Sequence, residues 1–67
     1  METFAERLKA ARAAAGITQQ GMADLTLIPL RTLQKWEIGE RTPPDYVQRF
    51  VLNELTEMVI LATQENE

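Results

Sequence analysis

Residues 17–37 read I-T-Q-Q-G-M-A-D-L-T-L-I-P-L-R-T-L-Q-K-W-E, and this stretch decides the fold. Thr18 is a good N-cap, because its side-chain oxygen can accept a backbone N–H that the first turn of a helix leaves unpaired. Pro29 suits the first position of a second helix, where its missing N–H costs nothing. The stretch therefore predicts two short helices, from Thr18 to about Leu25 and from Pro29 to Trp36, joined by a small turn.

The second of these helices has two different faces. Leu33 and Trp36 follow each other at helical spacing and point inward, so we interpret Trp36 as a core anchor rather than a residue that stacks on bases. The opposite face carries Leu30, Arg31, Gln34 and Lys35. One helix that braces and a second with an outward polar face are what a helix-turn-helix needs to enter a DNA major groove.

The sequence resembles the helix-turn-helix of phage repressors and Cro, the XRE type. The matching pieces are T-Q at 18–19, M-A at 22–23, R-T-L-Q-K-W-E at 31–37 and G-E-R-T-P at 39–43, within a similarity from about Leu8 to Val51. The last two pieces also resemble a subgroup of small bacterial regulators and antitoxin-like proteins. In the family the turn usually carries Gly or Asn, because the chain there is left-handed. This chain has Leu27 at that position, and Thr26 where an apolar residue is common.

The resemblance implies a set of DNA contacts. It implies a phosphate contact for Gln19 and for Arg41, and contact with bases or phosphates for Arg31 and Lys35 rather than simple solvation. Leu30 could touch a thymine methyl or pack on a neighbouring residue. The expected DNA-binding residues are Thr18, Gln19, Leu30, Arg31, Thr32, Gln34, Lys35 and Arg41. The family also pairs an arginine with a glutamate, which implies that Arg12 and Glu37 form a structural ion pair between the first and third helices.

Before this stretch, residues 3–15 predict a first helix. Thr3 and Glu6 have the T-x-x-E spacing of a capping box, and Gly16 suits the C-terminal end. An apolar stripe runs through Phe4, Leu8, Ala11 and Ala15 at helical spacing. This helix should therefore pack one face against the core.

After it, residues 44 to about 63 predict a long last helix, whose first half, including Val47 and Phe50, should cover the core. Beyond that the run 58–62 is apolar throughout and cannot lie on one face, so it would expose a patch that small monomers rarely tolerate. A homodimer would bury the patch and set two recognition helices ~34 Å apart for a palindromic site. The alternative is a monomer whose tail folds back on the surface from Phe4 to Leu8. The expected interface consists of Leu55, Met58, Val59, Ile60 and Leu61.

Composition excludes other classes of function. The 67 residues make one domain, and the absence of Cys and His removes disulfides, thiolates, imidazole bases and the usual zinc ligands. None of the ten carboxylates has a base or metal partner, so we expect no enzyme, no catalytic or metal site and no cofactor. No signal region or membrane span is present, which indicates a cytoplasmic protein without a membrane partner.

The formal net charge of −3 is unevenly distributed. Residues 1–43 hold six basic and five acidic residues, whereas residues 44–67 hold one basic and five acidic residues. The acidic tail is either a solvated face or a field that disfavours non-specific DNA binding.

Together these observations predict an all-α fold of four or five helices around one core. The expected function is sequence-specific binding of double-stranded DNA by a homodimeric transcriptional regulator, a repressor that controls its own operon. The resemblance adds a toxin–antitoxin, phage or mobile-element context and a toxin or mobile-element protein as partner. The alternative is a protein-binding module whose acidic, apolar last helix engages such a partner, and salt-dependent duplex binding separates the two.

Overall fold

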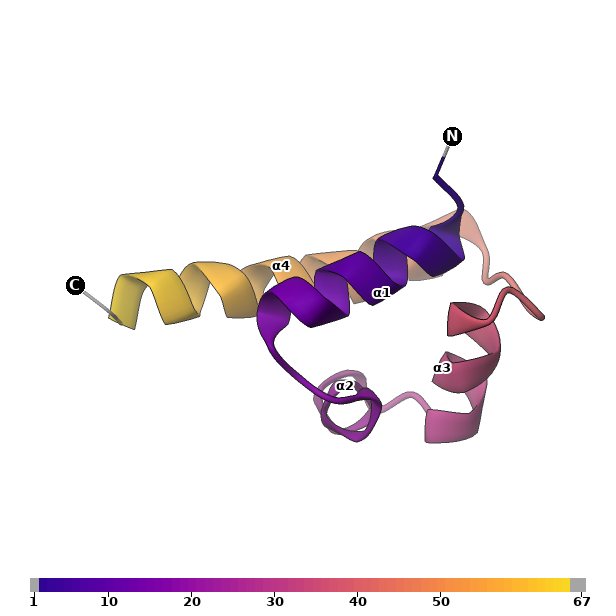
Figure 1. Ribbon diagram of the computed structural model, residues 1–67, viewed down its shortest axis with the longest axis horizontal. Helices are drawn as coiled ribbons and strands as arrows, with labels where there is room; N and C mark the ends of the chain where they lie inside the picture. Colours follow the sequence, from indigo (N-terminus) through magenta and orange to yellow (C-terminus); the bar gives the residue numbers. More distant parts are fainter. Residues whose placement is uncertain (1, 66–67) are drawn as a thin grey trace.

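The computed structural model describes residues 2–65, with the side chains of residues 2–61, and Figure 1 shows their four helices. The helices are α1 (Phe4–Ala15), α2 (Gln19–Thr26), α3 (Leu30–Glu37) and α4 (Asp45–Glu65). The part of the chain that is described has no strand, which confirms the all-α prediction with four helices rather than five. The outermost ends of the predicted domain, residues 1, 66 and 67, lie outside the described residues.

The ends of α1 follow the predicted signals. The Thr3 hydroxyl accepts the Glu6 backbone N–H at 3.2 Å, and the Glu6 carboxylate accepts the Thr3 backbone N–H at 3.2 Å. These reciprocal bonds form the capping box. The pKa of Glu6 is lowered, chiefly by the bond that its carboxylate accepts from the Thr3 backbone N–H and then by the bond that it accepts from the Thr3 hydroxyl. At the other end Gly16 is left-handed, with φ 70°, and its N–H bonds to the carbonyl of Ala13.

The turn between α2 and α3 is left-handed at a leucine. Thr18 caps α2 by accepting the Gly21 N–H, and Leu27 ends it with φ 62° and ψ 23°. Thr26 turns inward and is buried, whereas the preceding Leu25 is 37% exposed. The buried Thr26 hydroxyl donates to the Met22 carbonyl at 2.8 Å and accepts the Ile28 N–H at 3.3 Å. A polar residue therefore fills a position that is usually apolar without leaving its hydroxyl unpaired.

Helix α3 begins one residue later than predicted. Pro29 has φ −54° and ψ 138°, so it is the N-cap and not the first helical residue. Its carbonyl still accepts the Leu33 N–H at 3.2 Å, which starts the helical ladder. Gly39 is left-handed with φ 80° beyond the other end of the helix, and it turns the chain toward α4.

The core lies between the four helices, where α1 and α2 each pack against both α3 and α4. Its buried apolar members are Phe4, Leu8, Met22, Ala23, Leu33, Trp36, Val51 and Leu55. The rings of Phe4 and Trp36 meet edge to face, with centroids 6.0 Å apart and an interplanar angle of 69°. Trp36 is thus a core residue, as its spacing predicted.

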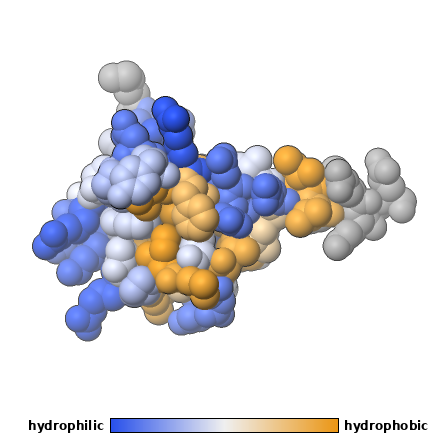
Figure 2. Space-filling view, turned by 180° about the vertical axis from the view of Figure 1, so that it is seen from behind, coloured by the Kyte–Doolittle hydropathy of each residue, from blue (hydrophilic) through white to orange (hydrophobic). Residues whose placement is uncertain are grey.

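Helix α4 runs in the same direction as α1, and its C-terminal part projects beyond the end of α1 (Figure 1). As far as Glu65, α4 therefore does not fold back over Phe4, although the monomeric alternative requires this. The predicted α4 stripe is wrong at Phe50, which is 46% exposed. Tyr46, which was not part of that stripe, is also exposed. Figure 2, seen from behind, shows apolar surface in the middle of this face and polar surface toward the end that carries α3. No helix among residues 2–65 is long and apolar enough to cross a membrane.

Candidate nucleic-acid interface

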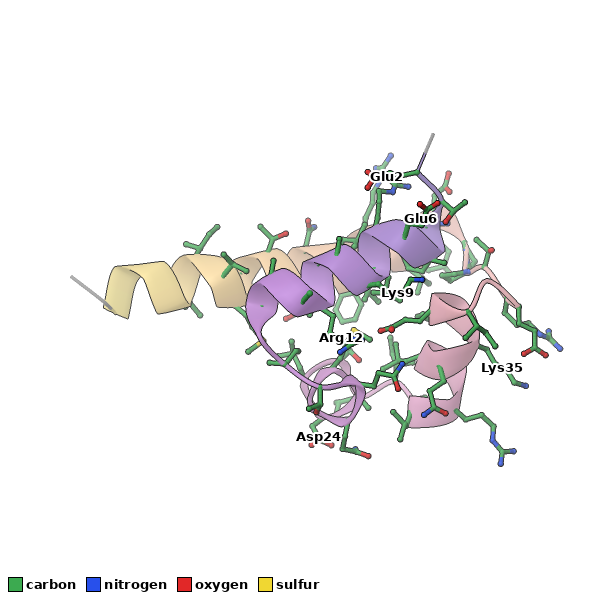
Figure 3. All side chains as sticks on the ribbon, in the orientation of Figure 1. Glu2, Glu6, Lys9, Arg12, Asp24 and Lys35 are labelled. Atoms are coloured by element: carbon green, nitrogen blue, oxygen red, sulfur yellow. The ribbon has the colours of Figure 1, made fainter. Side chains whose placement is uncertain are left out.

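Helix α3 presents a polar face to solvent. Arg31 and Gln34 are exposed on it, and Thr32 and Lys35 are half-buried beside them. Figure 3 shows the Lys35 side chain extending from α3 away from α1 and α4. Because Leu33 and Trp36 hold the opposite face in the core, α3 is fixed in rotation with these four side chains outward.

The end of α3 brings Arg41 back beside this face. The Lys35 carbonyl accepts the Glu40 N–H at 3.0 Å and the Arg41 N–H at 3.4 Å, which folds the connection over the last turn. A shallow hollow results, lined by Thr32, Lys35, Trp36 and Arg41. That Trp36 also lines this hollow was not predicted from the sequence, because its spacing assigned it only to the core. The signal that the chain turns back here was Gly39.

Leu30 occupies an intermediate position. It is half-buried and packs against the core cluster, although it opens the same helix as Arg31. Of the two alternatives for this residue, the free protein adopts packing on a neighbour.

The start of α2 lies next to α3. The exposed Thr18 hydroxyl accepts the Gly21 N–H at 3.0 Å, so its own hydrogen remains able to donate. Gln19 is half-buried and makes two contacts with α3. Its Nε2 donates to Glu37 Oε1 at 3.2 Å, and its Oε1 accepts from Gln34 Nε2 at 3.4 Å. Sequence reasoning did not anticipate either contact.

An ion pair joins α1 to the end of α3. Arg12 Nε donates to Glu37 Oε2 at 2.7 Å, and Arg12 Nη2 donates to Oε1 at 3.1 Å. Arg12 Nη1 also donates to the Ile17 carbonyl at 3.1 Å. In Figure 3 Arg12 reaches from α1 into the space between α2 and α3. Glu37 is only 4% exposed, and its hydrogen bonds raise the pKa of Arg12, so neither charge is free to meet a ligand.

Exposed cations lie on α1, on α4 and at the α3 end, where three basic residues occur together. Arg31 and Arg41, with the half-buried Lys35, lie on or beside α3, and the exposed acid Glu40 directly precedes Arg41. Asp24 on α2 accepts a hydrogen bond from Gln20 at 3.0 Å. Figure 3 places Glu2 and Glu6 on the side of α1 away from α2 and α3. The α3 end therefore offers cations to an anionic ligand, although the whole chain is acidic.

The residues expected at a dimer interface do not all reach the surface. Leu55 is fully buried, so its place in the expected interface is wrong: α1 and α4 lie side by side far enough along to cover it. Met58 and Val59 are half-buried, whereas Ile60 is 49% and Leu61 58% exposed. Beside them a groove between α1 and α4 is lined by Ala11, Ala14, Leu55, Thr56, Val59 and Ile60.

Comparison with known proteins gives one positive finding. A family model described as helix-turn-helix matches residues 8–48, which cover α1 from Leu8 onward, all of α2 and α3, and the start of α4. No curated protein and no solved structure matches the chain significantly.

Proposed function

This chain belongs to the helix-turn-helix family of XRE-type DNA-binding regulators, and on that premise we propose that it is a transcriptional repressor. It binds a palindromic operator as a homodimer and so controls its own operon. The observation that carries the proposal is the polar face of α3, held outward by Leu33 and Trp36 and flanked by Arg41. Helix α3 has eight residues, and an α-helix with its side chains is ~10–12 Å in diameter, which suits a major groove ~12 Å wide.

Within this proposal the side chains have different tasks. Arg31 and Lys35 read base edges from α3, with Thr32 and Gln34 between them. Thr18, Gln19 and Arg41 hold backbone phosphates on either side, which fixes the register of the helix on the duplex. Leu30, half-buried in the free protein, offers at most its outer edge to a thymine methyl.

The dimer rests on the projecting end of α4. Ile60 and Leu61 are about half exposed there, and the groove along Ala11 and Ala14 lies beside them. Small residues allow a second helix to approach closely, so the same segment of a second copy can pack against this end. A two-fold interface of this kind also adds core to a chain of 67 residues, which is marginal alone.

Selection from a random duplex library tests DNA recognition. The wild type should enrich a two-fold-symmetric site with half-sites about 10 base pairs apart, and its affinity should fall steeply with salt. A chain that enriches no sequence and binds duplex without salt dependence would be a protein-binding module instead, with a toxin or mobile-element protein as its partner.

Two arginines provide a matched comparison on the selected site. Arg31→Ala should cost about 1–3 kcal/mol and relax the preference at one base pair. Arg49→Ala removes the same charge from an exposed position on α4, beside Arg7 of α1, and should change affinity little. Equal losses for the two variants, or equal losses of Arg31→Ala on selected and random duplex, would remove Arg31 from base reading.

Sedimentation tests the dimer separately. The wild type should have twice the chain mass at micromolar concentration, and Ile60→Asp should restore the monomer. Asn53→Asp adds the same charge at an exposed position of the same helix and should leave the mass unchanged. A wild type that stays monomeric, or an Ile60→Asp variant that stays dimeric, contradicts this interface.

A further inference from the structure

A continuous chain of hydrogen bonds runs from the interior to the polar face of α3. It begins with Arg12 on α1, passes through the buried Glu37 and through Gln19 on α2, and ends at the exposed Gln34. The successive donor–acceptor distances are 2.7, 3.2 and 3.4 Å. Three helices thus meet in one polar path whose outer end is a residue on the face proposed to enter the groove.

Glu37 decides which way the Gln19 amide points. A carboxylate only accepts hydrogen bonds, whereas an amide has a donating end and an accepting end. Glu37 Oε1 therefore takes the amino end of Gln19, and the reversed amide would place oxygen against oxygen. Arg12 binds both oxygens of the Glu37 carboxylate, and the remaining accepting end of Gln19 faces Gln34.

The Gln19 oxygen in turn orients Gln34. It takes one N–H of the Gln34 amino group, so the Gln34 carbonyl oxygen and its second N–H stay available on an exposed side chain. One acceptor beside one donor matches the N6 amino group and N7 of adenine in the major groove. A Gln34 amide with free rotation would present that pair in either order and would discriminate less.

We propose that Gln34 reads adenine and that Glu37, acting through Gln19, is the positioning residue that sets the order of donor and acceptor. This inference rests on the proposed function, because it assigns a base preference to the α3 face. It gives the buried ion pair a second role beyond joining α1 to α3.

The test compares sites selected from a random duplex library by four proteins, under conditions where circular dichroism shows each to be folded. The wild type should prefer adenine at one position by about 5- to 100-fold. Gln34→Ala should remove the preference at that position alone. Glu37→Gln should remove it too, because a neutral amide can offer Gln19 either its oxygen or its amino group.

Arg12→Lys is the matched control. It breaks the bidentate pair and the bond to the Ile17 carbonyl but leaves the Glu37 carboxylate next to Gln19. It should lower thermal stability and yet keep the adenine preference. A merely structural role for Glu37 would make Arg12→Lys and Glu37→Gln behave alike, with lower affinity and an unchanged base preference.

A second measurement needs no DNA. In the side-chain amide region of a ¹H–¹⁵N spectrum, Glu37→Gln should move the Gln19 signals, and Gln34→Ala should move them less. A wild type that selects no sequence would overturn the proposed function and this inference together. A wild type that selects a site whose base preferences survive Glu37→Gln, or Gln19 signals that do not respond to it, would overturn only the inference.

Discussion

Replacing Leu27 by glycine should stabilise the protein. The residue has φ 62° and ψ 23°, a conformation that costs an L-residue about 1–2 kcal/mol through its Cβ. Its side chain is 87% exposed, so little burial is lost on its removal. Glycine removes the strain, but it also gives the unfolded chain more conformational freedom, which lowers the stability of the fold by about 0.4–1 kcal/mol. The expected net gain is about 0.5–1 kcal/mol, and Leu27→Asn should gain similarly because Asn tolerates this region.

Thermal unfolding followed by circular dichroism at fixed protein concentration measures the gain. In a domain of this size 1 kcal/mol corresponds to about 4–8 °C in the midpoint, so a rise of several degrees is expected. Leu27→Ala keeps the Cβ and should leave the midpoint nearly unchanged. Gly16→Ala is the converse control: at φ 70°, with no atom within 4 Å of the added Cβ, it should lose about 1 kcal/mol purely through the backbone.

A lower midpoint for Leu27→Gly, or a loss of more than about 1 kcal/mol for Leu27→Ala, would contradict backbone strain at Leu27. Either outcome would mean that the leucine side chain is covered in solution. A second copy or another partner seated on the turn would then be the explanation.

Three further outcomes follow from the contacts. Glu37→Ala should destabilise by about 2–4 kcal/mol because it leaves Arg12 unpaired, and a thermodynamic cycle with Arg12→Ala should give less than the sum of the single losses; strict additivity would exclude an interaction. Thr26→Val should cost about 1–2 kcal/mol in urea unfolding, because the Ile28 N–H loses its acceptor; a neutral result would mean that water replaces it. Because the pKa of Glu6 is lower in the folded protein, its ionised carboxylate contributes fully to stability above about pH 4.5, and this contribution is lost as the pH falls through the folded-state pKa. Glu6→Gln should therefore weaken the fall in unfolding free energy at acid pH, and an unchanged fall would contradict this.

The sequence could predict what depends on near neighbours. Thr3 and Glu6 are three residues apart, Gly16 directly follows α1, and Thr18 directly precedes α2. Each cap therefore depends on residues within a single helical turn, which the sequence shows directly. The left-handed turn at Leu27 was located for the same reason, although its residue type is unusual there. These local signals were sufficient for the all-α fold and for the position of the helix-turn-helix.

Contacts between helices were harder to predict. Periodicity gives the angle of a side chain on its helix but not the neighbour that covers it, so it assigned Leu55 to a dimer and Phe50 to the core. In the structure Leu55 is buried in the core and Phe50 is exposed, because the overlap of α1 with α4 decides which turns of α4 are covered. The bond between Gln19 and Glu37 spans 18 residues, and its direction depends on how α2 meets α3, which no local pattern encodes.

Trp36 makes the unlabelled protein its own optical probe. It is the single tryptophan of the sequence, so the near-ultraviolet emission of the intact chain comes mainly from one place. Its ring meets Phe4 of α1 on the inside and lines the hollow with Lys35 and Arg41 on the outside. The indole therefore reports both on the docking of α1 against α3, through the red shift that accompanies exposure, and on any ligand that fills the hollow, through quenching without a shift. One emission spectrum can distinguish an unfolded variant from a folded one that has lost its ligand.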